Sequence, residues 1–111
     1  MAKIATLELT GASGAVYEFN VYSADASWKE GLACVYYVSK RTEKAEGGGT
    51  HAVIYVGETE DMAVRHTDHH KQVCFERHGY NAISIHRESN AQTRLRIEAD
   101  LVKILDPPCN A

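Results

Sequence analysis

A short apolar stretch that ends in glycine is the feature that most constrains the fold. The segment Val53-Ile54-Tyr55-Val56-Gly57 is rich in β-branched and aromatic residues, which favour a buried strand. The chain then becomes polar. Thr59 is suited to a helix N-cap, and the two acidic residues that follow it, Glu60 and Asp61, suit the positive end of a helix. The sequence therefore predicts a strand that leads directly into a helix ending near His70.

The preceding segment predicts a partner for this strand. Residues 33–40 are again β-branched and aromatic, and the polar stretch 41–51 contains three consecutive glycines. We expect 41–51 to be a flexible hairpin loop and the two strands to be antiparallel. Because side chains alternate between faces along a strand, both phenols point to the same side of the sheet if Tyr36 and Tyr55 lie nearly opposite each other.

The N-terminal residues predict a second hairpin. Residues 4–9 and 16–22 flank a turn at 11–14, and Tyr17, Phe19 and Val21 fall on one face of the second strand. An irregular connection over 23–31 carries Trp28, which suits a lid on the core better than a platform for a nucleic-acid base.

The C-terminal half predicts one short helical segment, one strand and one long helix. Residues 71–81 suit a short helical or irregular segment, and residues 82–87 suit a strand. Ser89 and Gln92 form a capping-box pattern that opens a helix reaching about Leu105, before two prolines stop it. Together these patterns predict an α+β fold with a three-stranded antiparallel central sheet flanked by helices. Residues 1–32 would be an N-terminal β-hairpin extension packed on a domain formed by residues 33–111.

One carboxylate interrupts the apolar stripe of the last helix. Glu98 is spaced to lie among the apolar residues Leu95, Leu101, Val102 and Leu105. A carboxylate on an inward face must be paired or bind a cation, because burying it alone is costly. Glu98 is therefore either the partner of Arg94 or Arg65, or a metal ligand.

The first predicted helix has two faces of unusual composition. Met62, Arg65 and His69 share one face, which is either a solvated surface with a partly covered arginine or a functional one. His66 and His70 form an i, i+4 pair on the neighbouring face. This pair could hold zinc together with Cys74 or Cys109, although surface histidines are the commoner explanation.

Cysteine usage and charge restrict the class of protein. The three cysteines, which include Cys34, are odd in number and widely spaced, and this argues against a disulfide framework and against a thiolate zinc knuckle. The net charge of −3 argues against tight non-specific DNA binding, although residues 61–111 carry equal numbers of acidic and basic side chains. No apolar run is long enough to span a membrane, so we expect a soluble cytoplasmic protein.

The order of these residues resembles the GIY-YIG nuclease superfamily. Cys34-Val35-Tyr36 and Tyr55-Val56-Gly57 are similar to the paired tripeptides that name it. Arg65 and His69 follow at similar spacing, Glu98 lies midway along a later helix, and residues 107–110 resemble the closing Pro-Pro-x-Asn. The resemblance covers residues 33–110. It departs from the family in having Cys34 in place of glycine and a longer loop at 41–51.

The resemblance implies a GIY-YIG-like fold and a role for each of six residues. Tyr36 and Tyr55 would position or activate the attacking water, and Arg65 would hold the scissile phosphate. His69 would move a proton, which leaves either Tyr36 or His69 as the general base. Glu98 would bind one divalent metal ion, Mg²⁺ or Mn²⁺, and Asn110 would brace the site.

Three functions remain in competition at the level of the sequence. The first is a metal-dependent endonuclease that hydrolyses DNA, which could be branched or distorted. Its specificity would come from the N-terminal hairpin, a partner protein or a homodimer, since residues 1–32 are too short for an ordinary DNA-binding domain. The second is a non-catalytic module that keeps the fold and binds nucleic acid or protein, as the negative charge favours. The third is a metal-binding protein that uses His66, His70 and Cys74.

Overall fold

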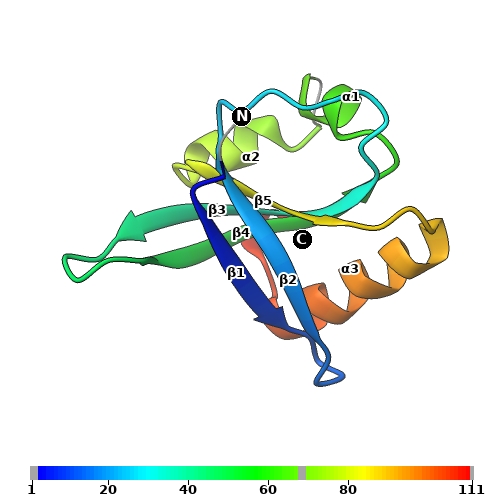
Figure 1. The fold of residues 1–111 in the computed structure, drawn as a ribbon, viewed down its shortest axis with the longest axis horizontal. Coiled ribbons are helices and arrows are strands. Elements are labelled where there is room, and N and C mark those ends of the chain that lie inside the picture. Colours follow the sequence, from blue (N-terminus) through cyan, green and yellow to red (C-terminus); the bar gives the residue numbers. More distant parts are fainter. Residues whose placement is uncertain (1–2, 68–69, 111) are drawn as a thin grey trace.

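The computed structural model describes residues 3–67 and 70–110, with the backbone alone for 66 and 67. Over these residues strands and helices mix in one α+β chain (Figure 1). In order the elements are β1 (Ala5–Thr10), β2 (Val16–Ser23), β3 (Cys34–Glu43), β4 (Gly49–Thr59), α1 (Met62–Thr67), α2 (Gln72–Arg77), β5 (Ala82–Arg87), α3 (Ala91–Leu105) and the 3₁₀ turn η1 (Pro108–Asn110).

The strands form one antiparallel sheet of five strands, in the order β1-β2-β5-β3-β4. The α+β class is confirmed, whereas the expected three-stranded sheet is wrong. The N-terminal hairpin joins the sheet because β2 pairs with β5 over Asn20–Ser23. The pairing covers an edge of β5 that a three-stranded sheet would leave open, and it places Phe19 and Val21 in the core.

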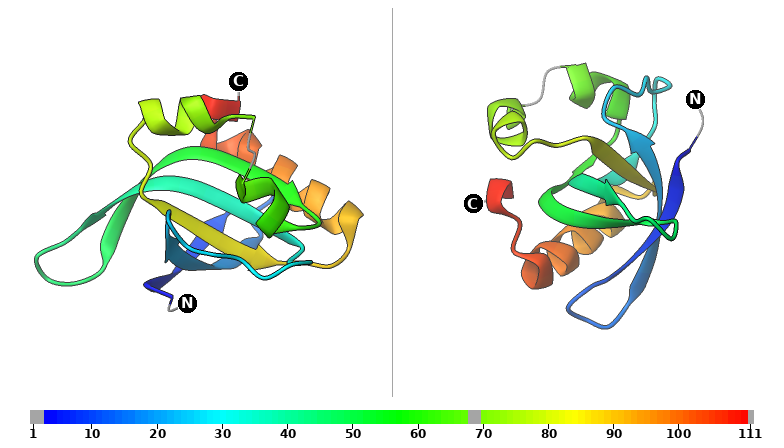
Figure 2. Two further views of the ribbon diagram at one scale, coloured as in Figure 1. Left: turned by 90° about the horizontal axis from the view of Figure 1, so that it is seen from above. Right: turned by 90° about the vertical axis from the view of Figure 1, so that its left-hand side faces the viewer.

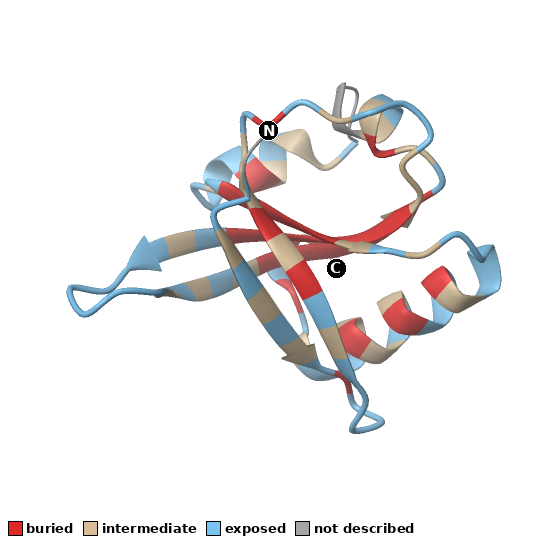
Figure 3. Ribbon diagram, in the orientation of Figure 1, coloured by how far each residue is buried: buried red, intermediate tan, exposed pale blue. Residues whose placement is uncertain are grey.

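The sheet separates two apolar layers. On one face Met62 of α1 and Phe75 of α2 pack with Tyr36 and Tyr55, and Trp28 is partly buried against the same cluster. On the other face Ile97 and Leu101 of α3 pack on strand residues that include Phe19 and Val56. Figure 2 shows α1 and α2 on one side of the sheet and α3 on the other. Figure 3 shows the buried stripe of α3 turned toward the strands.

The β3–β4 hairpin is longer than the sequence predicts. In place of the expected loop over residues 41–51, Arg41 pairs with His51 and Glu43 pairs with Gly49, so that only residues 44–48 form the loop. The hairpin extends away from the body of the molecule (Figure 1). Strands in an exposed arm need no apolar face, and for that reason their polar composition looks like a loop in the sequence.

Helices α1 and α3 begin at caps other than those predicted. Asn90, not Ser89, caps α3 by accepting a hydrogen bond from the backbone N–H of Thr93 at 2.9 Å. For α1 the carboxylate of Asp61 accepts from the N–H of Ala63 at 3.1 Å, and Thr59 in turn accepts from the N–H of Asp61. Asparagine and aspartate are as effective as serine or threonine at this position, and a short sequence pattern does not separate neighbouring candidates.

The buried stripe of α3 differs from the predicted one. Arg94, Ile97 and Leu101 are buried, whereas Leu95 is 54% exposed. Compared with the prediction, the helix is rotated about its axis so that Glu98 lies beside the buried stripe and not at its centre.

In the described part of the chain, no helix is both long and apolar enough to cross a membrane.

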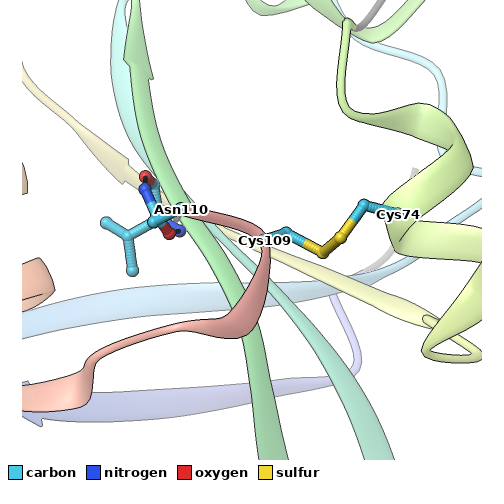
Figure 4. Close-up of a disulfide and its surroundings, with 4 residues drawn as sticks. Cys74, Cys109 and Asn110 are labelled. Carbon is cyan, nitrogen blue, oxygen red and sulfur yellow. Dashed lines mark hydrogen bonds between the residues drawn. A yellow bond between two sulfur atoms is a disulfide. The ribbon is translucent and has the colours of Figure 1, made fainter.

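The cysteine prediction is also wrong. Cys74 of α2 and Cys109 of η1 form a disulfide across a sequence separation of 35 residues, with the Cα atoms 5.9 Å apart (Figure 4). Cys34 is a buried free thiol. An odd number of widely spaced cysteines does not reveal which two of them the tertiary fold brings together.

Candidate functional site

Two tyrosines and one glycine form the centre of the candidate site. Tyr36 is paired with Gly57 and Tyr55 with Val38, so the two phenols lie on one face but are diagonal neighbours, not direct opposites. Their ring centroids are 5.9 Å apart. A Cβ atom at Gly57 would lie 2.5 Å from the Tyr36 hydroxyl and 2.7 Å from the Tyr55 ring. The glycine therefore provides the space into which both phenols pack.

The two phenols share a hydrogen bond and differ in exposure. Tyr36 is 1% exposed and Tyr55 is 8% exposed. Burial, mainly, raises the pKa of Tyr36, and the neighbouring Tyr55, to which it forms a hydrogen bond, raises this pKa further. Burial also raises the pKa of Tyr55, followed by the charge of Glu98. Both phenols are therefore neutral in this structure.

Arg65 brings a positive charge to this tyrosine pair. It lies on α1, is partly buried, and forms a hydrogen bond to Tyr36 that lowers the pKa of that phenol. The charge of Arg65 also lowers the pKa of Tyr55 and of Glu98. This arginine is consequently the residue that links the phenols on one face of the sheet to the carboxylate on α3.

Glu98 reaches the free edge of β4. The backbone N–H of Glu58 donates a hydrogen bond to its carboxylate, which lowers the pKa of Glu98. Burial and the nearby Glu58 carboxylate have the larger, opposite effect, so the pKa of Glu98 is raised overall. The repulsion between two carboxylates is the kind of electrostatic strain that a bound cation relieves.

Glu58 is the partner that the sequence analysis missed. Its carboxylate accepts a hydrogen bond from Arg94 Nε at 3.0 Å, and Arg94 also donates to the carbonyl oxygens of Glu88 and Ser89. Arg94 therefore pairs with Glu58 and not with Glu98, which was one of the alternatives that the sequence left open. The alternation of a strand contains the missing signal, because Glu58 follows Val56 onto the face that α3 covers.

Asn110 binds the same edge of β4. Its side-chain amide donates to the carbonyl oxygen of Val56 and accepts from the Val56 N–H, both at 2.9 Å (Figure 4). Asn110 thus satisfies both outward backbone groups of Val56, and Glu98 satisfies the backbone N–H of Glu58. Through these two hydrogen bonds Asn110 holds in place the strand that carries Tyr55.

A groove of about 530 Å³ opens beside these residues. It lies between the end of β4, helix α1 and the start of α3, and its lining includes Arg65, Arg94 and Glu58. Glu60 and Asp61 also line it, so the groove carries charges of both signs. The remaining predicted site residue, His69, lies outside the described residues, as does the side chain of His66.

The carboxylates at this corner fit a hard divalent cation. Mg²⁺ takes one or two carboxylate ligands and retains several waters, and Glu98 with the adjacent Glu58 offers that kind of oxygen donor set. In the oxidised state shown here Cys74 offers no thiolate to the proposed zinc set His66, His70 and Cys74, and the His66 side chain of that set lies outside the described residues. Among the described residues, the one group of three or more convergent histidine, cysteine and acidic side chains is Cys74, His78 and Cys109.

The structure therefore brings Tyr36, Tyr55, Arg65 and Glu98 to one end of the sheet, with Asn110 bound to the strand beside them. These side chains come from separate elements of the chain. In comparisons with known proteins, no protein-family model, curated protein or solved structure matches this chain.

Proposed function

We propose that this protein is a metal-dependent endonuclease of the GIY-YIG type that hydrolyses DNA phosphodiester bonds. The observation that carries the proposal is the electrostatic linkage of Tyr36, Tyr55, Arg65 and Glu98, which are contributed by β3, β4, α1 and α3. The unit β5-β3-β4, with helices on both faces, also supports the proposed GIY-YIG-like fold.

The chemistry of these residues suits attack on a phosphate. Hydrolysis places negative charge on the phosphate oxygens, and the planar fork of Arg65 can bind two of them. Glu98, with Glu58 beside it, would hold Mg²⁺ or Mn²⁺, which supplies Lewis-acid stabilisation and an activated water when bound.

We assign the two tyrosines different roles in positioning that water. Tyr36 is hydrogen-bonded to Tyr55 and is almost completely buried, so it orients its neighbour and does not contact water directly. Tyr55 is the more exposed of the two, so we assign water positioning to Tyr55. A bound cation and Arg65 would both favour the Tyr55 phenolate.

The test is cleavage of labelled single-stranded, duplex, flapped and branched DNA, and of RNA, with Mg²⁺, Mn²⁺ or EDTA. We expect metal-dependent cleavage of DNA, and Glu98→Gln should lower its rate by about 100-fold or more. Glu46→Gln makes the same chemical change in the exposed hairpin tip and should cleave like the wild type. The proposal is wrong if the wild type is inert with every substrate and metal, or if Glu98→Gln cleaves normally.

One observation favours a non-catalytic binding module as the second candidate. Glu58, Glu60 and Asp61 line the groove beside Arg65, and their charges oppose the close approach of a nucleic-acid backbone. If the substrate panel is not cleaved, gel-shift measurements on the same panel with wild type and Arg65→Gln distinguish nucleic-acid binding from protein binding.

A further inference from the structure

Three side chains outside the candidate nuclease site converge at the C-terminal end of the chain. One ligand atom from each of Cys74, His78 and Cys109 lies within 4.8 Å of the other two. Cys74 and Cys109 are joined as a disulfide, and Figure 4 shows this bond linking α2 to the segment that carries Asn110. Two thiols and an imidazole are the donor set of a soft or borderline metal ion.

The local structure positions the histidine for such a role. His78 follows Cys74 by four residues at the end of α2, and its N–H donates to the Cys74 carbonyl oxygen at 3.2 Å. Residues at this spacing lie on the same side of a helix. His78 is exposed, Cys74 is half-buried and Cys109 is buried, so the cluster opens to solvent on its histidine side.

We propose that Cys74, His78 and Cys109 form a zinc site in the reduced protein, which oxidation to the Cys74–Cys109 disulfide empties. Two thiolates bound to tetrahedral zinc lie about 3.8 Å apart. In the oxidised state the two sulfur atoms are bonded and closer than this, so they would move apart on reduction, while His78 already lies within 4.8 Å of both. Three protein ligands leave the fourth position to water on the exposed side.

The exchange between the two states balances with peroxide as the oxidant. Zinc binding releases the two thiol protons. Hydrogen peroxide then takes two electrons from the two thiolates and two protons from solvent; the S–S bond forms, the O–O bond breaks, and two waters and Zn²⁺ are released. Cys34 does not compete for either reaction, because burial raises the pKa of its thiol to about 12.

Both states hold η1 against α2. In the oxidised state a covalent bond ties Cys109 to α2, and in the reduced state the zinc ion does so. Asn110, the next residue, is bound to the backbone of Val56 in β4. The cluster of Cys74, His78 and Cys109 therefore keeps Asn110 in place under both reducing and oxidising conditions. This inference does not depend on the proposed nuclease activity.

The experiment measures metal in the full chain under both redox conditions. Protein purified with a phosphine reductant and equilibrated with Zn²⁺ should hold about one zinc per chain after gel filtration. Cobalt substituted for zinc should show thiolate-to-cobalt charge-transfer absorption. A small excess of hydrogen peroxide should release the zinc to a chromogenic chelator and remove two free thiols per chain.

Variants identify the ligands. His78→Ala changes an exposed side chain and should weaken zinc binding at least about tenfold, whereas His70→Ala, also at the surface, should not. Cys74→Ser should abolish the charge-transfer band, and its circular dichroism shows whether the variant is folded. The proposal is overturned if reduced, folded wild type retains no zinc, or if His78→Ala binds zinc as tightly as His70→Ala.

Discussion

At the scale of single residues, Gly57 is a position where the packing leaves no room for a side chain. An alanine methyl group there would overlap the Tyr36 hydroxyl at 2.5 Å and the Tyr55 ring at 2.7 Å. Tyr36 is buried within the core cluster. The family-like glycine thus has a plain steric reason in this chain.

Gly57→Ala should lower the free energy of unfolding by about 1–3 kcal/mol, the usual cost of overpacking a core. Urea unfolding followed by circular dichroism gives the value. Gly49→Ala is the matched control, because the nearest atoms to its Cβ would belong to the guanidinium group of Arg41, the far end of a flexible side chain. Equal effects of the two substitutions would contradict the steric account.

The raised pKa of Glu98 predicts how stability depends on pH. The pKa is raised by burial and then by repulsion from Glu58. The folded state therefore binds the proton of this carboxyl group more tightly than the unfolded chain does, where its pKa is near 4.5. The stabilising contribution of this group is complete below that pH and is lost as pH rises through the raised folded pKa.

Glu98→Gln should therefore gain stability relative to the wild type as pH rises from 4.5 toward 7.5. Melting temperatures across this range measure the difference. Added Mg²⁺ should raise the melting temperature of the wild type and leave Glu98→Gln unchanged, since only the wild type keeps the paired carboxylates. A constant gap between the two proteins at every pH would contradict the assignment.

At the scale of elements, the free edge of β4 is closed by side chains and not by another strand. Asn110 of η1 binds both backbone groups of Val56, and Glu98 of α3 binds the N–H of Glu58. The sequence pattern indicates a chemical role for both residues, and their contacts in the structure also protect an exposed edge.

Asn110→Ala should cost about 1–3 kcal/mol, because it leaves a partly buried N–H and carbonyl without partners. Asn110→Asp should not restore the loss, since the second aspartate oxygen would face the Val56 carbonyl oxygen that the amide now satisfies. Thermal unfolding of the three proteins under identical redox conditions tests this. Wild-type stability in the aspartate variant would show that only the bond from the Val56 N–H contributes.

At the scale of the whole molecule, the N-terminal hairpin is part of the central sheet. Residues 33–111 alone would lose the pairing of β2 with β5 and the contacts of Phe19 with the α3 side of the core. We expect this fragment to aggregate or to lack a cooperative thermal transition. The full chain with residues 44–48 replaced by Asn-Gly is the control, because that loop contributes nothing to either core cluster. A stable monomeric fragment would show that the hairpin is dispensable for folding.

The elements are largely predictable because their signals are local. Alternation in residues 16–22 and the breaks at glycine and proline indicate five strands and the long helix, and β5 has the bounds that the sequence predicts. The predicted bounds of an element are wrong where an exposed strand is made of polar residues, as in the β3–β4 arm. They are also wrong where either of two neighbouring residues could cap a helix, as at Ser89 and Asn90.

The sequence by itself determined which residues could carry unusual chemistry, and these include Tyr36, Tyr55, Arg65 and Glu98. Only the tertiary structure decided their partners. The orientation of α3 places Arg94 in an ion pair with Glu58, and the fold brings Cys74 and Cys109 together as a disulfide. The N-terminal hairpin completes a five-stranded sheet. The reason is that local pattern depends on neighbours along the chain, whereas pairing depends on contacts between distant segments that exist only once the layers have packed.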